Sequence, residues 1–191
     1  MRMFLRKSVR PREPLAVAMS GVRMGERVLQ IGIDDPALTG ALAAKPGLSG
    51  HAAIAVGDEA SAARARNAAA EAGALADVAV TPLDALPFQP ESFDSVVIHS
   101  VDGLLASFDE EHRVRVAQAC HRVLRKGGRV LVIEAGPRTG LAGLFRAGPK
   151  PSSAFEEGGG SAAVLKAAGF VAVRLLAARE GRSFTEGLKS S

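Results

Sequence analysis

A glycine turn that follows a short apolar strand is the first place in this chain where a ligand could be held. Residues 25–31 read as a charged turn and then a buried strand, Gly32 allows a tight turn, and Pro36 suits the first position of a helix. A backbone that a ligand can approach closely, followed by a helix N-terminus, is typical of a ligand site at the end of a parallel strand. We therefore expect a nucleotide-type cofactor site here.

Residues suited to metal or thiol chemistry are few. The single cysteine, Cys120, falls on the apolar stripe of an expected helix and reads as a small buried hydrophobic residue. His51, His112 and His121 are isolated or lie on expected helix surfaces. No residues have the spacing of a metal-binding cluster, so we predict no metal site and no internal disulfide.

The elements that must position the site alternate between strand and helix. Apolar runs predict strands, and alanine-rich or amphipathic runs with matching end charges predict helices. Strands are expected at about 25–31, 52–56, 77–81, 93–98 and 128–134, and helices at about 14–24, 36–45, 59–72, 109–126 and 161–168. Residues 170–176 and 182–186 predict an antiparallel strand pair. The alternation indicates an open α/β sheet.

Length and composition indicate one domain. The 191 residues are 47% hydrophobic and 23% charged, which is ordinary for a globular protein with one core. We expect a flexible basic arm at 1–13 and a single domain at 14–191. Residues 136–160, rich in glycine and proline, suggest a lid, a binding loop or a disordered segment. No apolar run approaches the ~18 residues that span a bilayer, and no secretory signal is visible, so a cytoplasmic location is expected.

The net charge of +4 comes from the N-terminal arm. Residues 1–12 hold five basic residues and no acidic one, whereas the rest of the chain is nearly balanced. A solvated arm is the simpler interpretation, and nucleic acid is an unlikely partner. The alternative, a phosphate-binding arm, predicts steep salt dependence that disappears when residues 1–12 are deleted.

Four segments, taken together in their order and spacing, resemble one family. They are Gly25 to Gly32, the pair Asp84 to Phe88 and Ser92 to Val97, Arg122 to Leu131, and Leu165 to Phe170. The chain resembles the class I S-adenosylmethionine-dependent methyltransferases, especially small members similar to quinone-biosynthesis C-methyltransferases. The resemblance covers nearly the whole chain beyond the basic arm.

This resemblance implies a Rossmann-like fold. The expected sheet is open and twisted, with about seven mostly parallel strands, the last antiparallel, and helices on both faces. The cofactor, S-adenosyl-L-methionine, is then expected across the carboxyl ends of strands one to four, in agreement with the general rule for open α/β sheets. A dinucleotide-binding domain is the competing use of this architecture, but no G-x-G-x-x-G follows the first strand.

The resemblance also implies which residues bind the cofactor. In the family the first loop reads acid, apolar, Gly, x, Gly, x, Gly, and the corresponding positions are Gln30, Ile31, Gly32, Ile33, Asp34, Asp35 and Pro36. Gly32 alone remains of the family's three glycines. Gln30 can still accept a hydrogen bond from an ammonium group, though without charge assistance.

Three further groups of residues follow from the same resemblance. Asp58 or Glu59 would hold the ribose hydroxyls, while Asp58 also reads as a helix N-cap. The loop of Asp84, Ala85 and Leu86 would contact the adenine, although Asp84 also reads as a turn residue between prolines. His99 and Ser100 end the fourth strand near the cofactor's methyl end. His99 could accept a proton from the methyl acceptor or could be a hydrogen-bonded rim residue.

Two functions of different classes follow. The first is in-line methyl transfer to a small or lipid-like acceptor, which needs little acid–base machinery because proximity and orientation supply most of the acceleration. The second is a methyltransferase-like ligand-binding or protein-interaction module without activity, which the altered glycine loop favours. The oligomeric state cannot be read from the sequence.

Overall fold

The computed structural model describes residues 14–136 and 153–191. The helices are α1 (Leu15–Ser20), α2 (Pro36–Ala44), α3 (Glu59–Glu71), α4 (Glu110–Val123), α5 (Ser153–Glu157) and α6 (Gly160–Ala167), with a short 3-10 helix, η1, at Leu105–Ser107. The strands are β1 (Arg27–Ile31), β2 (His51–Val56), β3 (Ala76–Val80), β4 (Phe93–Ser100), β5 (Leu124–Ala135), β6 (Val171–Arg179) and β7 (Arg182–Leu188). The predicted arm at 1–13 and most of the predicted loop at 136–160 lie outside the described residues.

Within the described residues, seven strands form one sheet in the order β3-β2-β1-β4-β5-β7-β6. β1 pairs in parallel with β2 and β4, β2 with β3, and β4 with β5. β7 is inserted between β5 and β6 and is antiparallel to both. The predicted Rossmann-like sheet with an antiparallel last strand is confirmed, and the strand order reverses between β1 and β4.

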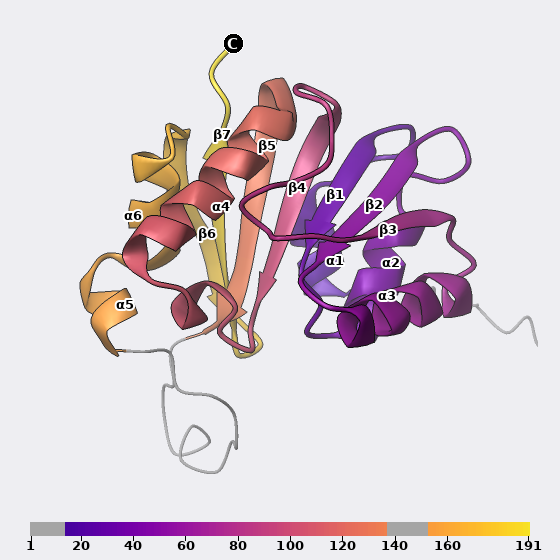
Figure 1. Ribbon diagram of the computed structural model, residues 1–191, viewed down its shortest axis with the longest axis horizontal. Helices are drawn as coiled ribbons and strands as arrows, with labels where there is room; N and C mark the ends of the chain where they lie inside the picture. The colour runs from indigo at the N-terminus through magenta and orange to yellow at the C-terminus, as the bar shows by residue number, and fades with distance from the viewer. Residues whose placement is uncertain (1–13, 137–152) are drawn as a thin grey trace, which may run out of the picture.

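Helices cover both faces of this sheet (Figure 1). On one face, apolar residues of α4 and α6, including Val116, Cys120 and Leu165, pack against Leu29 and Val132 of the strands. On the other face, α1 and α2 pack on alternate residues of the same strands. Cys120 is fully enclosed, and burial raises the pKa of its thiol to about 12. The sequence's assignment of this cysteine to the core is therefore confirmed.

Two predicted helix ends are wrong. Helix α1 was expected to continue to Met24, but it ends at Ser20, with Gly21 as its left-handed C-cap. Helix α4 was expected to continue to Lys126, but it ends at Val123, and Leu124 is already extended and paired with Phe93 of β4. The apolar side chain of Leu124 is fully buried, so the strand gains core contacts that another helical turn would lose. Gly127, with a φ of +71°, lies within β5 in the stretch where the pairing with β4 shifts register between Leu124 and Arg129.

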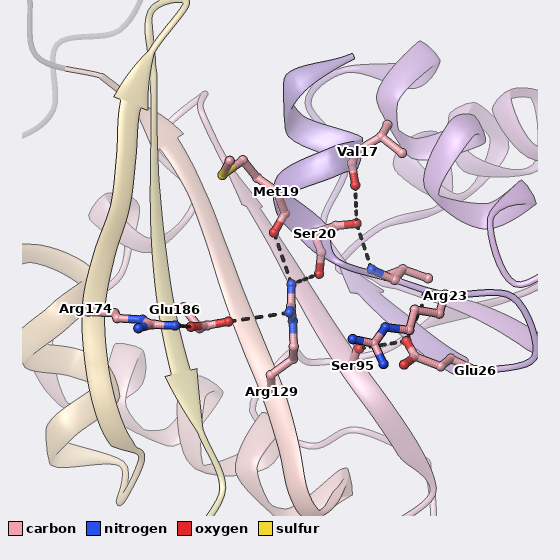
Figure 2. A network of polar contacts seen from close by, with 10 residues as sticks. Val17, Met19, Ser20, Arg23, Glu26, Ser95, Arg129, Arg174 and Glu186 are labelled. Atoms are coloured by element: carbon pink, nitrogen blue, oxygen red, sulfur yellow. Dashed lines mark hydrogen bonds and ion pairs between the residues drawn. The ribbon is translucent and has the colours of Figure 1, made fainter. Parts of the chain in front are cut away.

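Arg129 of β5 fastens α1 to the sheet (Figure 2). Its Nη2 donates to the carbonyl oxygens of Met19, at 3.1 Å, and of Ser20, two groups that the end of a helix leaves without intrahelical partners. Its Nη1 lies 3.6 Å from Oε1 of Glu186, a carboxylate that is only 5% exposed. Arg174 donates to the other oxygen of Glu186 at 3.0 and 3.1 Å. The network joins α1, β5, β6 and β7.

Replacing Arg129 by methionine should therefore destabilise the fold. Two helix-end carbonyls lose their donor and a buried carboxylate loses one of two cations, which should lower the free energy of unfolding by about 2–4 kcal/mol. Arg125→Met is the matched control, because Arg125 lies in the same strand but its side chain is 55% exposed and pairs with Asp94 at the surface. There we expect a loss of about 0–1 kcal/mol. Urea unfolding of both variants checks this, and equal losses would contradict it.

Candidate functional site

A pocket of about 510 Å³ opens at the carboxyl ends of β1, β2 and β4, where the strand order reverses. Its lining comes from the turns after these strands and after β3, and comprises Gly32, Ile33, Asp34, Val56, Gly57, Asp58, Ser61, Pro82, Leu83, His99, Asp102, Gly103, Leu104, Ser107, Phe108 and His112. Among these residues there are three carboxylates and neither lysine nor arginine. The pocket lining thus combines apolar side chains with three carboxylates.

Gly32 is the point at which the chain turns from β1 towards α2. Its φ is +76°, and its N–H donates to the carbonyl oxygen of Ala55 at 2.8 Å. A Cβ at this position would lie 2.8 Å from Cδ2 of Leu104 and 3.3 Å from the carbonyl oxygen of His99. Both the conformation and the space therefore require glycine, as the sequence suggested for a tight turn.

Gln30 does not reach the pocket. Its side chain is fully buried beneath the turn, where Nε2 donates to the carbonyl oxygen of Thr39 in α2 at 3.1 Å. Its Oε1 lies 2.8 Å from Nε2 of His99. Ile31 is likewise a core residue, whereas Ile33 lines the pocket as expected. The predicted contact of Gln30 with a bound ammonium group would need a different arrangement from this one.

Asp34 lies in the pocket wall and is tied to β4. Its Oδ2 accepts from the N–H of Val101 at 2.7 Å, and its Oδ1 lies 3.4 Å from Nδ1 of His99. Burial alone would raise the pKa of Asp34, but the interaction with His99 and the N–H groups of Val101 and Asp35 outweigh it and hold that pKa below its ordinary value. Asp34 is therefore an ionised, anchored residue of the wall.

The two candidates for holding a ribose are placed differently. Asp58 lines the pocket and caps α3, with Oδ1 accepting from the N–H of Ser61 and Oδ2 from its hydroxyl, both at 2.8 Å. These bonds hold the pKa of Asp58 below its ordinary value. Glu59 is exposed, does not line the pocket, and lies 3.4 Å from Arg66. The geometry favours Asp58, and its N-cap role is confirmed.

The predicted adenine loop approaches the pocket through other residues than expected. Asp84 is turned towards α4, where its Oδ2 lies 3.2 Å from Nε of Arg115 and 3.9 Å from Nε2 of His112. Ala85 is exposed and Leu86 is in the core, so none of the three lines the pocket. The preceding residues, Pro82 and Leu83, do. The loop therefore borders the pocket through residues that precede the three predicted ones.

The loop that follows β4 supplies lining that the sequence did not single out. Ser100 is buried, and its hydroxyl accepts from the N–H of Leu105 at 3.0 Å, which orders the loop rather than presenting the hydroxyl to a ligand. Phe108 stacks on His112 with ring centroids 4.3 Å apart and planes 8° apart. The sequence feature that could have indicated this loop is the Asp102–Gly103 pair, which is typical of a turn and directly follows a strand that ends at this edge of the sheet. His112 itself was expected on a helix surface.

For a metal site and for a membrane-spanning helix, the structure can be searched only within its described residues. Across residues 14–136 and 153–191, no three histidine, cysteine, aspartate or glutamate side chains are grouped so that they could hold a metal ion. In the same residues, no helix combines the length and apolar character needed to cross a bilayer.

Comparison with known proteins supports the family suggested by the sequence. The family described as "Methyltransferase domain" matches residues 25–132. A search of curated proteins found no match. Among solved structures, an S-adenosylmethionine-dependent methyltransferase from Aquifex aeolicus is 17% identical over 91% of this chain and 87% of its own, with a TM-score of 0.69.

Two other solved structures show how widely this fold is used. The YcgJ protein of Bacillus subtilis is 13% identical, covers 93% of this chain and 97% of its own, and has a TM-score of 0.64. The [4+2]-cyclase SpnF is 17% identical, covers 92% of this chain and 78% of its own, and has a TM-score of 0.60. At these identities the likenesses establish the fold.

The requirement for glycine at position 32 can be tested by measuring stability. Gly32→Ala should lower the free energy of unfolding by about 1–3 kcal/mol, because alanine is strained at positive φ and its Cβ would meet Leu104 and the backbone of His99. Gly57→Ala is the control, since Gly57 lines the same pocket but a Cβ there meets nothing within 4 Å. Thermal or urea unfolding measures both. If Gly57→Ala lowers the free energy of unfolding as much as Gly32→Ala does, position 32 has no special requirement for glycine.

Proposed function

This chain belongs to the methyltransferase domain family, and we propose that it transfers the methyl group of S-adenosyl-L-methionine in line to a small or lipid-like acceptor. The observation that carries the proposal is the acid-lined pocket at the carboxyl edge of the sheet, built around Gly32 within the matched residues. In open α/β sheets, ligands bind at this edge where the strand order reverses.

The residues present fit this cofactor. The pocket volume falls within the range of pockets that hold small ligands. Apolar side chains, including Leu83, Leu104 and Phe108, can cover an adenine ring. S-adenosylmethionine carries a net positive charge, because its sulfonium and ammonium groups outweigh its carboxylate. A lining with carboxylates and no lysine or arginine favours such a cation.

Different residues would contact different parts of the cofactor. Asp58 is placed to accept from the ribose hydroxyls while it caps α3. Backbone groups at Gly32 and Gly57 can approach a ligand closely, since neither carries a side chain. The bound cofactor supplies an electrophilic methyl group on a sulfonium. The chain's own residues bind, orient and exclude water, and these effects can provide most of the acceleration.

The acceptor is a separate part of the proposal. We expect the acceptor to be contacted by residues 1–24 and 136–160, most of which lie outside the described residues. Proton transfer by His99 stays a prediction. Its ring is buried and both ring nitrogens face protein side chains, an arrangement that favours a different role for it.

Calorimetry with S-adenosylmethionine tests the proposal and separates the two ribose candidates. We expect the wild type to bind, and Asp58→Asn to weaken binding about tenfold, because it removes a charged acceptor but keeps a residue that caps helices well. Glu59→Gln, at the adjacent exposed carboxylate, should leave the affinity unchanged.

Three outcomes decide the matter. If the wild type gives no heat at high-micromolar S-adenosylmethionine or S-adenosylhomocysteine, the enzyme proposal is abandoned and the module without activity is favoured. If Glu59→Gln weakens binding and Asp58→Asn does not, the ribose assignment moves to Glu59. If both variants bind as the wild type does, neither carboxylate holds the ribose.

A further inference from the structure

A continuous chain of polar contacts lies beneath the pocket. It runs from the carbonyl oxygen of Thr39 through the amide of Gln30 to the ring of His99, then through the carboxylate of Asp34 to the N–H of Val101. The side chains of His99 and Asp34 are 0% and 6% exposed. These contacts join α2, β1, β4 and the turn after Gly32.

The hydrogens in this chain can be assigned from one end. A carbonyl oxygen only accepts, so the Gln30 group that faces Thr39 must be its NH₂. Oε1 of Gln30 therefore faces Nε2 of His99, 2.8 Å away, and that nitrogen must carry a hydrogen. The tautomer of His99 is fixed by its partner.

The other ring nitrogen then faces a carboxylate. Nδ1 of His99 lies 3.4 Å from Oδ1 of Asp34, and neither atom has another hydrogen-bond partner. If His99 carried hydrogen only on Nε2, two lone pairs would face each other in a buried site, which is unfavourable. A second hydrogen on Nδ1 turns the same contact into an attractive ion pair.

We infer that His99 is a positioning residue that carries hydrogen on both ring nitrogens, and that its ion pair with Asp34 holds the wall of the pocket in its binding arrangement. Asp34 and His99 both line the pocket, and Asp34 also fixes Val101, where the loop bearing Leu104 and Phe108 begins. The identity of the ligand rests on the proposed function. The positioning role rests on the contacts described above.

The other charged groups near this pair do not touch the His99 ring. Asp34 is the carboxylate in contact with the ring. The neighbouring Asp35 is occupied by Arg182 of β7 at 2.6 Å, and Arg64 of α3 reaches only the backbone oxygen of Asp34, at 3.4 Å. Asp102 and His112 line the same pocket. Loss of the Nδ1 hydrogen would leave the Asp34 carboxylate without its partner and release this part of the wall, and the lost preorganisation should weaken ligand binding even though the pocket becomes more negative.

Asp34→Asn tests this role with a side chain of the same shape. Asparagine can still accept from Val101 through Oδ1 and can donate from Nδ2 to a neutral Nδ1, so the contact no longer needs the second hydrogen. The probe is S-adenosylmethionine alone, with its dissociation constant measured from about pH 6 to about pH 8.5. Asp35→Asn, at the neighbouring carboxylate that does not line the pocket, is the control.

We expect the wild type and Asp35→Asn to bind about tenfold more weakly at the high end of the range, and Asp34→Asn to be nearly flat by comparison. Comparing variants removes the titration of the ligand itself. A second readout needs no ligand: the ¹H–¹⁵N spectrum of the histidine rings should show both nitrogens of His99 protonated at about pH 6 in the wild type, and only Nε2 in Asp34→Asn.

The outcomes separate this inference from the proposed function. If the wild type binds equally at all pH values and His99 carries one ring hydrogen, the inference is overturned while the proposed function stands. If the wild type binds at no pH, the proposed function fails, and the ring spectrum alone still decides the state of His99. Because no acceptor is present, a role of His99 as general base would leave these binding curves flat.

Discussion

The buried hydrogen bond between Gln30 and His99 joins β1 to β4 at the point where the strand order of the sheet reverses. The connections that follow β1 and β4 lead to helices on opposite faces of the sheet, so the ends of these two paired strands border a hollow. A charged residue at position 30 would face a large desolvation penalty, because this side chain is fully buried. Glutamine is neutral, can both donate and accept, and so satisfies α2 and β4 together.

Two aspartates hold the turn that follows. Asp34 bonds the first residue beyond β4, and Asp35 caps α2 through Leu38 at 3.2 Å while it pairs with Arg182 at the start of β7. Further glycines at this turn would leave more backbone freedom to be lost when a ligand binds. Side-chain contacts to two other strands restrict that freedom before binding. The turn after Gly32 is therefore preorganised by side-chain contacts.

The sequence predicted the scaffold well because its signals are local. Apolar runs, the Asp35–Pro36 start of α2 and the Gly169–Phe170 entry to the last strand pair each depend on a few consecutive residues. The site was predicted less completely because its contacts are not local. Asp84 turns towards Arg115, which is 31 residues away, and His99 meets Gln30 across 69 residues. No periodicity reports which way such a side chain points. The end of α4 was missed for a similar reason, since Leu124 follows its strand partner Phe93.

The position of β7 has a consequence for the order in which the molecule can form. β6 precedes β7 in the chain but lies outside it in the sheet, so the outer edge of β5 has no native partner until residues 182–188 have been synthesised. Glu186, whose carboxylate pairs with Arg129, belongs to the same segment. Contacts between residues so distant along the chain form slowly. A nascent chain that stops short of this strand would expose an open strand edge of the kind that pairs with other chains.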